Sequence, residues 1–141
     1  MKRNGDLHKK GQSLIEFALL LPVFLLVAVI IFDLGRAVYY YSAVHNAARE
    51  GARYGAVYPN DSNGMKTRAV NYAIGLGLTT TNVAAGAGTP IVVGGFSNPT
   101  VKVTVTYSFT PATPLLGRFL PGGAITLKGE AVMRTESLPS P

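Results

Sequence analysis

The side chain with the clearest chemical potential is the carboxylate of Glu16, because it lies within a long run of apolar residues. A carboxylate in the hydrocarbon of a bilayer is costly, so it usually marks a function or a partner. If the chain were cut after Gly11, Gln12 would become the first residue and Glu16 the fifth. The ammonium group freed on Gln12 could pair with Glu16 of a neighbouring helix in a medium of low dielectric constant. The predicted chemistry is an ion pair between subunits that fixes their axial stagger.

Other residue types that carry chemistry are few and scattered. The chain has no cysteine, which excludes disulfides and thiolate metal sites. His8 and His45 lie on different segments and have no acidic cluster at metal-ligand spacing. We find no nucleophile accompanied by a base and an orienting acid, and after Val57 the only acids are Asp61, Glu130 and Glu136. We therefore expect no enzyme, cofactor, metal ion or small-molecule substrate.

The element that must position Glu16 is a helix. Leu14–Leu34 contains only two charged residues, Glu16 and Asp33. As a helix it would be about 31 Å long, which matches the hydrocarbon thickness of a bilayer. We predict one long helix over residues 12–58, hydrophobic and then amphipathic, with a membrane span at about 14–34. Pro22 removes one backbone donor within the span and predicts a kink or a loosened turn.

The second half of this helix carries two adjacent rows of small residues at four-residue intervals, namely Ala47, Gly51 and Gly55, and Ala48, Ala52 and Ala56. Small side chains let another helix or a sheet approach the backbone closely. The contacted surface is either the protein's own C-terminal domain or another subunit, and the sequence favours neither. Two pairs at i,i+3 spacing predict ion pairs on solvated helix faces: Asp33 with Arg36, and Glu50 with Arg53.

Three segments over about residues 10–58 together resemble one family. These segments read GQSLIEFALLLPVFLL, DLGRAVYY and HNAAREGARYGAV. They look like the TadE-like minor pilins, or pseudopilins, of tight-adherence (Tad/Flp) pili. The resemblance implies that a membrane prepilin peptidase cuts between Gly11 and Gln12, and that the mature protein joins other pilin subunits in a pilus for surface adhesion. Major Flp-type pilins are little more than leader and hydrophobic helix, so the extra C-terminal residues favour a minor subunit.

The charge distribution predicts the orientation in the membrane. The formal net charge is +6, but removing residues 1–11 leaves nine basic and six acidic residues, a net charge of +3. The basic leader, residues 1–11, is therefore expected in the cytoplasm, with the C-terminal domain exported. No stripe of Lys or Arg follows that could bind phosphates, so nucleic acid is not an expected partner. The expected location is the inner membrane, followed by the pilus or the extracellular space after processing.

Two alternatives to a processed pilin remain open. An ordinary secretory signal peptide has the same charged start, but its apolar core is shorter and no small-x-small cleavage site follows Phe32 directly. The chain could also stay uncleaved as a single-pass envelope protein whose exported domain binds a partner. The N-terminus of the native protein distinguishes the three: Gln12 for the pilin, Met1 for the anchor, and a residue beyond Phe32 for a secreted domain.

Residues 59–135 predict a small exported α+β domain. Met65–Leu76 has the pattern of a short helix, and residues 79–90 that of a loop. Val101–Phe109 alternates apolar and polar residues, and Ile125–Thr135 repeats the pattern. Ile91–Val93 is a candidate short edge strand. The expected fold class is α+β: a long membrane-spanning helix followed by one short helix and a two- or three-stranded antiparallel sheet.

The connection between the two clearest strands contains a candidate contact patch, formed by Leu115, Leu116, Phe119 and Leu120. These side chains lie among several prolines and glycines. So much apolar surface in a connection either folds back over the sheet or contacts a partner. Residues 136–141 are predicted to form a flexible tail.

Overall fold

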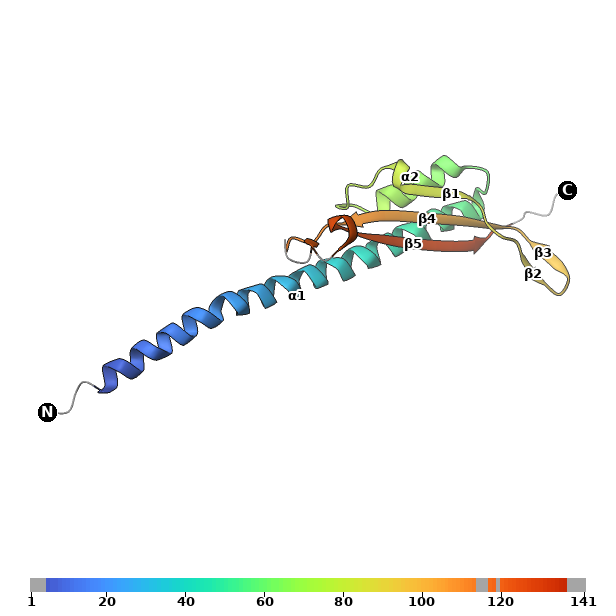
Figure 1. Cartoon of the computed structure of the whole chain (residues 1–141). Coiled ribbons are helices and arrows are strands. Elements are labelled where there is room, and N and C mark those ends of the chain that lie inside the picture. Colours follow the sequence, from blue (N-terminus) through green and yellow to red (C-terminus); the bar gives the residue numbers. More distant parts are fainter. Residues whose placement is uncertain (1–4, 114–116, 119, 137–141) are drawn as a thin grey trace.

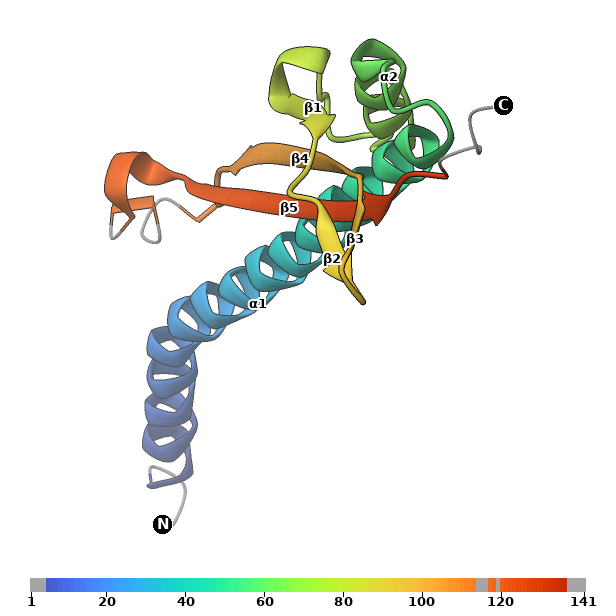
Figure 2. The same ribbon diagram turned by 90° about the vertical axis from the view of Figure 1, so that its right-hand side faces the viewer.

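The longest element is α1, a helix that runs from Gly5 to Val57 (Figure 1). In this computed structural model the described residues are 5–113, 117–118 and 120–136, with side chains described from residue 12 onward. The 53 residues of α1 correspond to about 80 Å. The predicted long helix is confirmed, and it begins before the expected first residue, Gln12. Figure 2 shows α1 changing direction in its blue-coloured part, which contains Pro22.

The short helix α2 spans Ser62–Tyr72 and lies beside the C-terminal part of α1 (Figure 2). It begins three residues before the predicted start because Asp61 caps it by accepting the Gly64 N–H at 2.8 Å. The Tyr54 hydroxyl donates to the same carboxylate at 2.8 Å. The Gly64 N–H, followed by the Tyr54 hydroxyl, lowers the pKa of Asp61. This cap therefore links the start of α2 to the end of α1.

A three-stranded antiparallel sheet has the order β1-β4-β5, with β1 at Val83–Ala87, β4 at Thr100–Phe109 and β5 at Ile125–Arg134. The two long predicted strands are thus confirmed as β4 and β5. The prediction of a loop over residues 79–90 was wrong, because it contains β1 and the single-turn 3₁₀ helix Thr80–Asn82. The sequence of β1, VAAGA, carries little intrinsic strand preference. Its pairing with β4, from Val83 opposite Val105 to Ala87 opposite Val101, determines its conformation.

A separate hairpin pairs β2, Ile91–Val93, with β3, Phe96–Asn98. Gly94 and Gly95 form its turn with φ values of 58° and 82°, which glycine adopts without strain. The strand expected at Ile91–Val93 exists, but it pairs with β3 and not with the three-stranded sheet. Figures 1 and 2 show this hairpin projecting away from that sheet.

The core lies where the second half of α1 meets α2 and one face of the sheet. β4 contributes its alternate residues Val101, Val103 and Val105 to this core, as its pattern predicts. On the opposite face of the sheet, Glu130 contacts the ammonium groups of Lys102 at 2.7 Å and Lys128 at 3.3 Å. Lys102 and then Lys128 lower the pKa of Glu130. Another 3₁₀ turn, Pro121–Gly123, leads into β5.

Candidate functional site

The first half of α1 is a rod that the rest of the described chain leaves uncovered. The large apolar side chains between Leu14 and Phe32 that are classed as exposed retain between 40% and 73% of their accessible surface. Residues 12–57 form one helix long and apolar enough to cross a membrane, by length and composition. A bare apolar surface of this size is unfavourable in water, so lipid or other protein must cover it. We call residues 12–32 the rod.

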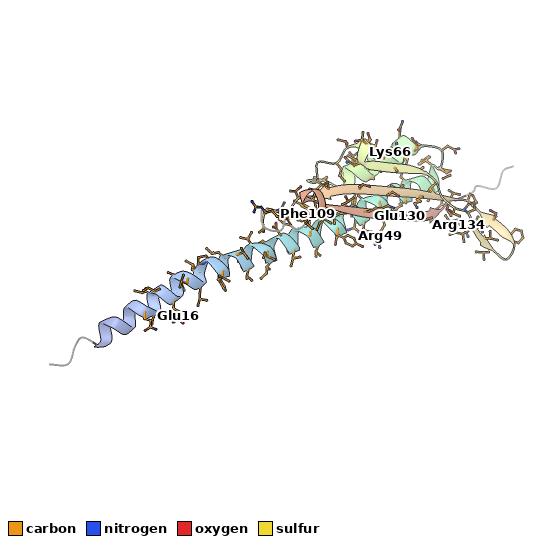
Figure 3. All side chains as sticks on the ribbon, in the orientation of Figure 1. Glu16, Arg49, Lys66, Phe109, Glu130 and Arg134 are labelled. Atoms are coloured by element: carbon orange, nitrogen blue, oxygen red, sulfur yellow. The ribbon has the colours of Figure 1, made fainter. Side chains whose placement is uncertain are left out.

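Glu16 lies on this rod, far from the folded domain (Figure 3). Its side chain is exposed, four residues after Gln12 on the same continuous helix. Gly11 is also helical. The structure therefore places Gly11, Gln12 and Glu16 close together at one end of the molecule, where a neighbouring chain could reach them.

The rod ends at Asp33, the first buried residue of α1 counting from Gln12. The residue is only 3% exposed. One carboxylate oxygen accepts the Ala112 N–H at 2.9 Å, and the other accepts the Thr113 N–H at 2.8 Å and the Thr113 hydroxyl at 2.6 Å. Charge-assisted hydrogen bonds of this length are among the stronger ones in proteins. Asp33 thus ties the chain after β4 to α1 at the boundary between rod and domain.

The expected pair of Asp33 with Arg36 is present at 3.2 Å, but the prediction that Asp33 lies on a solvated face was wrong. Arg36 also lies over the rings of Tyr40, at 5.7 Å, and Phe109, at 5.5 Å. Tyr40 in turn contacts Phe109 with ring centroids 5.7 Å apart. Sequence reasoning missed this cluster because the partners of Asp33 lie about eighty residues away. The only sequence feature that points to burial of Asp33 is its position at the end of an apolar run.

We expect Asp33→Asn to loosen the chain after β4 from α1. Both carboxylate oxygens of Asp33 accept hydrogen bonds, whereas an asparagine amide has one accepting oxygen and one donating NH₂ group. At least one of the three donors from Ala112 and Thr113 therefore loses its partner. Limited proteolysis of the full chain in detergent measures this, and we expect cleavage between β4 and β5 to be faster by roughly tenfold or more. Glu50→Gln is the matched control, because the pair of half-buried Glu50 with exposed Arg53 is long, at 3.9 Å. Equal cleavage rates in both variants would refute the assignment.

The two rows of small residues lie inside the domain. Ala47, Ala48, Gly51, Ala52 and Gly55 are buried, and Ala56 is half-buried. A methyl group on Gly51 would lie 2.9 Å from the Met65 carbonyl oxygen and 3.1 Å from the Val103 side chain. The surface that approaches these rows is therefore α2 and β4 of the same chain. A further role of these residues in contact between subunits stays a prediction.

The candidate contact patch falls mostly outside the described residues. Leu115, Leu116 and Phe119 are not described, and Leu120 is half-buried. Within the described ranges no group of three or more acidic, histidine or cysteine side chains could hold a metal ion. The structure shows an uncovered apolar rod with Glu16 near its start. At the end of the rod, hydrogen bonds of Asp33 to Ala112 and Thr113 attach the domain.

Comparison with known proteins identifies one part of the chain. No curated protein and no solved structure matches it. A family model described as TadE-like protein matches residues 11–53. The matched segment begins at Gly11, includes Glu16 and Asp33, and ends inside the half of α1 that packs against the domain. The match confirms the resemblance found in the sequence: residues 11–53 of α1 are similar to the TadE-like family.

Proposed function

We propose that this chain is a minor pilin or pseudopilin that a prepilin peptidase cuts after Gly11, and that it assembles into or with a Tad/Flp-type pilus for surface adhesion. The observation that carries the proposal is the uncovered apolar rod, which starts beside Gly11 and continues into a helix packed against its own small domain. The TadE-like match over residues 11–53 supports an association with Tad pili. This family is not a family of enzymes, and we assign the chain no catalytic role.

The rod has two successive partners in this proposal. Before assembly it lies in the inner membrane, with residues 1–11 in the cytoplasm and the domain exported. Cleavage after Gly11 then creates the ammonium group of Gln12, which pairs with Glu16 of a neighbouring pilin subunit. Before cleavage this cation does not exist. The peptidase therefore acts as a switch from storage in the membrane to competence for assembly.

The N-terminus of the native protein tests the proposal. We expect wild-type chain purified with its cognate peptidase to begin at Gln12, and Gly11→Ala to remain full length, because the residue before the cut is changed. N-terminal sequencing and intact mass measure both, with Gly35→Ala as a control glycine on the same helix that has no neighbour within 4 Å. A wild-type chain that begins at Met1, in cells whose peptidase cuts another pilin, would refute processing.

One observation favours an uncleaved membrane-anchored envelope protein as a second candidate. α1 is continuous from Gly5 through Gly11, so the bond to be cut lies inside a helix. A peptidase that requires an extended substrate would have to unwind this turn first. If the native chain begins at Met1 and remains in the membrane, the exported domain is a binding module on an anchor.

A further inference from the structure

The β2–β3 hairpin lies at the end of the described chain opposite to the rod (Figure 1). Four large apolar residues in it are exposed: Ile91 by 48%, Val92 by 67%, Val93 by 62% and Phe96 by 78%. No charged residue occurs anywhere between residues 69 and 101. An exposed, uncharged group of branched and aromatic side chains is a candidate contact site.

Three of these residues share one face of the hairpin. Val93 lies directly opposite Phe96, and Ile91 is two residues before Val93, so all three side chains point to the same side. The amide of Asn98, opposite Ile91, is occupied by hydrogen bonds to the carbonyl oxygens of Ile91 and Phe96. A two-stranded hairpin is only marginally stable in water, and a partner on this face would stabilise it.

The last part of the rod, together with Leu34, offers an apolar surface next to the domain. Phe24, Val27, Ile31 and Leu34 follow one another at three- or four-residue spacing and form one stripe, exposed by 72%, 47%, 62% and 60%. Asp33 and Tyr40 face the domain on another side of α1. The stripe therefore remains accessible just below the point where the domain begins.

We infer that the Ile91–Val93–Phe96 face of the hairpin packs against this stripe of a second copy of the chain. The inference rests on the proposed function, because the rod must leave the bilayer for the contact to form. The two surfaces differ and lie apart on one molecule, so joining them between copies gives a heterologous, head-to-tail contact, which can repeat along a fibre. Both surfaces lack charge, so bringing them together desolvates no unpaired ion.

Other possible partners of this hairpin face fit the same observations less well. A pair of hairpins packed on each other would close at two copies and leave both rods bare. Anionic lipid headgroups attract Lys and Arg, and residues 69–101 contain neither. Three apolar side chains form a patch on the order of 300–400 Å², well below the area of a stable interface on its own. The contact therefore forms in assembled fibres and adds to contacts between rods.

A photoreactive phenylalanine analogue at position 96 tests the contact in cells that assemble the pilus. We expect an adduct of twice the chain mass, and peptide mapping should locate the second site within residues 24–34. The same analogue at position 74 is the control, because Ile74 is 83% exposed but lies outside the hairpin. An adduct within residues 91–98, an adduct with lipid or with another protein, or no adduct from chain present in fibres would overturn the inference.

A second variant separates this inference from the proposed function. We expect Phe96→Ser to be processed normally and to lower the amount of chain in sheared fibres by about tenfold, while Ile74→Ser leaves it unchanged. Equal amounts for Phe96→Ser and wild type would overturn the inference alone. If wild-type chain is not processed and is absent from the fibre fraction, the proposed function fails, and the inference fails with it.

Discussion

Replacing Glu16 by alanine should leave cleavage after Gly11 intact and abolish assembly. In the proposed processing, the peptidase acts on the bond after Gly11, five residues before the substituted side chain. In the proposed assembly, by contrast, the ammonium of Gln12 must pair with the carboxylate of Glu16. A free ammonium buried in an apolar fibre core without a partner costs several kcal/mol, which is enough to prevent a stable contact. We therefore expect a processed chain that stays in the membrane fraction.

The spacing along the helix sets the axial shift that the proposed pairing would produce. Glu16 is four residues after Gln12 on one continuous helix, so pairing between neighbours shifts one rod against the next by about 6 Å. Removing the carboxylate also makes the rod more apolar, and insertion into the membrane becomes easier. Loss of assembly in Glu16→Ala can therefore not be explained by failure to insert.

Shearing of fibres, immunoblotting and N-terminal sequencing measure the outcome. Leu20→Ala is the matched control, because Leu20 lies one turn further along the rod and is exposed by 61%. Glu16→Gln separates charge from shape: it keeps the size of the side chain and should fail as alanine does. Normal fibres from both Glu16 variants would refute the ion pair, and normal fibres from Gly11→Ala as well would refute the whole scheme.

Periodicity in the sequence predicts the elements that have their own pattern. The apolar run predicts the rod, and the alternation in Val101–Phe109 predicts a central strand with one buried face, as observed for β4. β1 could not be predicted in this way, because alanine and glycine carry little strand preference and its conformation follows from pairing with β4. Local pattern describes neighbours along the chain, whereas pairing depends on residues that are distant in sequence.

The candidate site likewise contains residues that the local sequence pattern predicts and contacts that it does not. Glu16 is visible in the sequence because one acid among apolar residues is unusual whatever the fold. Asp33 has a similar setting, yet its role depends on Thr113, eighty residues later, and it was assigned to a solvated face. The hairpin strand at Ile91–Val93 was visible, but its projection away from the sheet was not. These contacts are tertiary, and a single sequence does not record them.

Substituting Gly129 by alanine should be the most damaging single methyl addition in the domain. Gly129 lies on β5 where that strand crosses α1, and an added methyl group would lie 2.6 Å from the Val44 carbonyl oxygen and 2.8 Å from the His45 nitrogen. Both neighbours are helix backbone, which cannot turn away as a side chain can. The strand must therefore move off the helix, and we expect a loss of about 3 kcal/mol in the free energy of unfolding.

Thermal unfolding of the full chain in detergent measures this effect, with a melting temperature lower by at least about 10 °C. Two glycines of α1 serve as comparisons, because an added methyl group should lower the melting temperature less at either of them than at Gly129. Gly55→Ala brings a methyl group within 2.5 Å of the Met65 sulfur, a flexible side chain that can shift, so the loss should be smaller. Gly35→Ala meets nothing within 4 Å and should be neutral or slightly stabilising, because alanine favours the helix by about 1 kcal/mol. If Gly129→Ala and Gly35→Ala melt at the same temperature, β5 does not lie against α1 as closely as the structure has it, and this contact does not hold the sheet to the second half of α1.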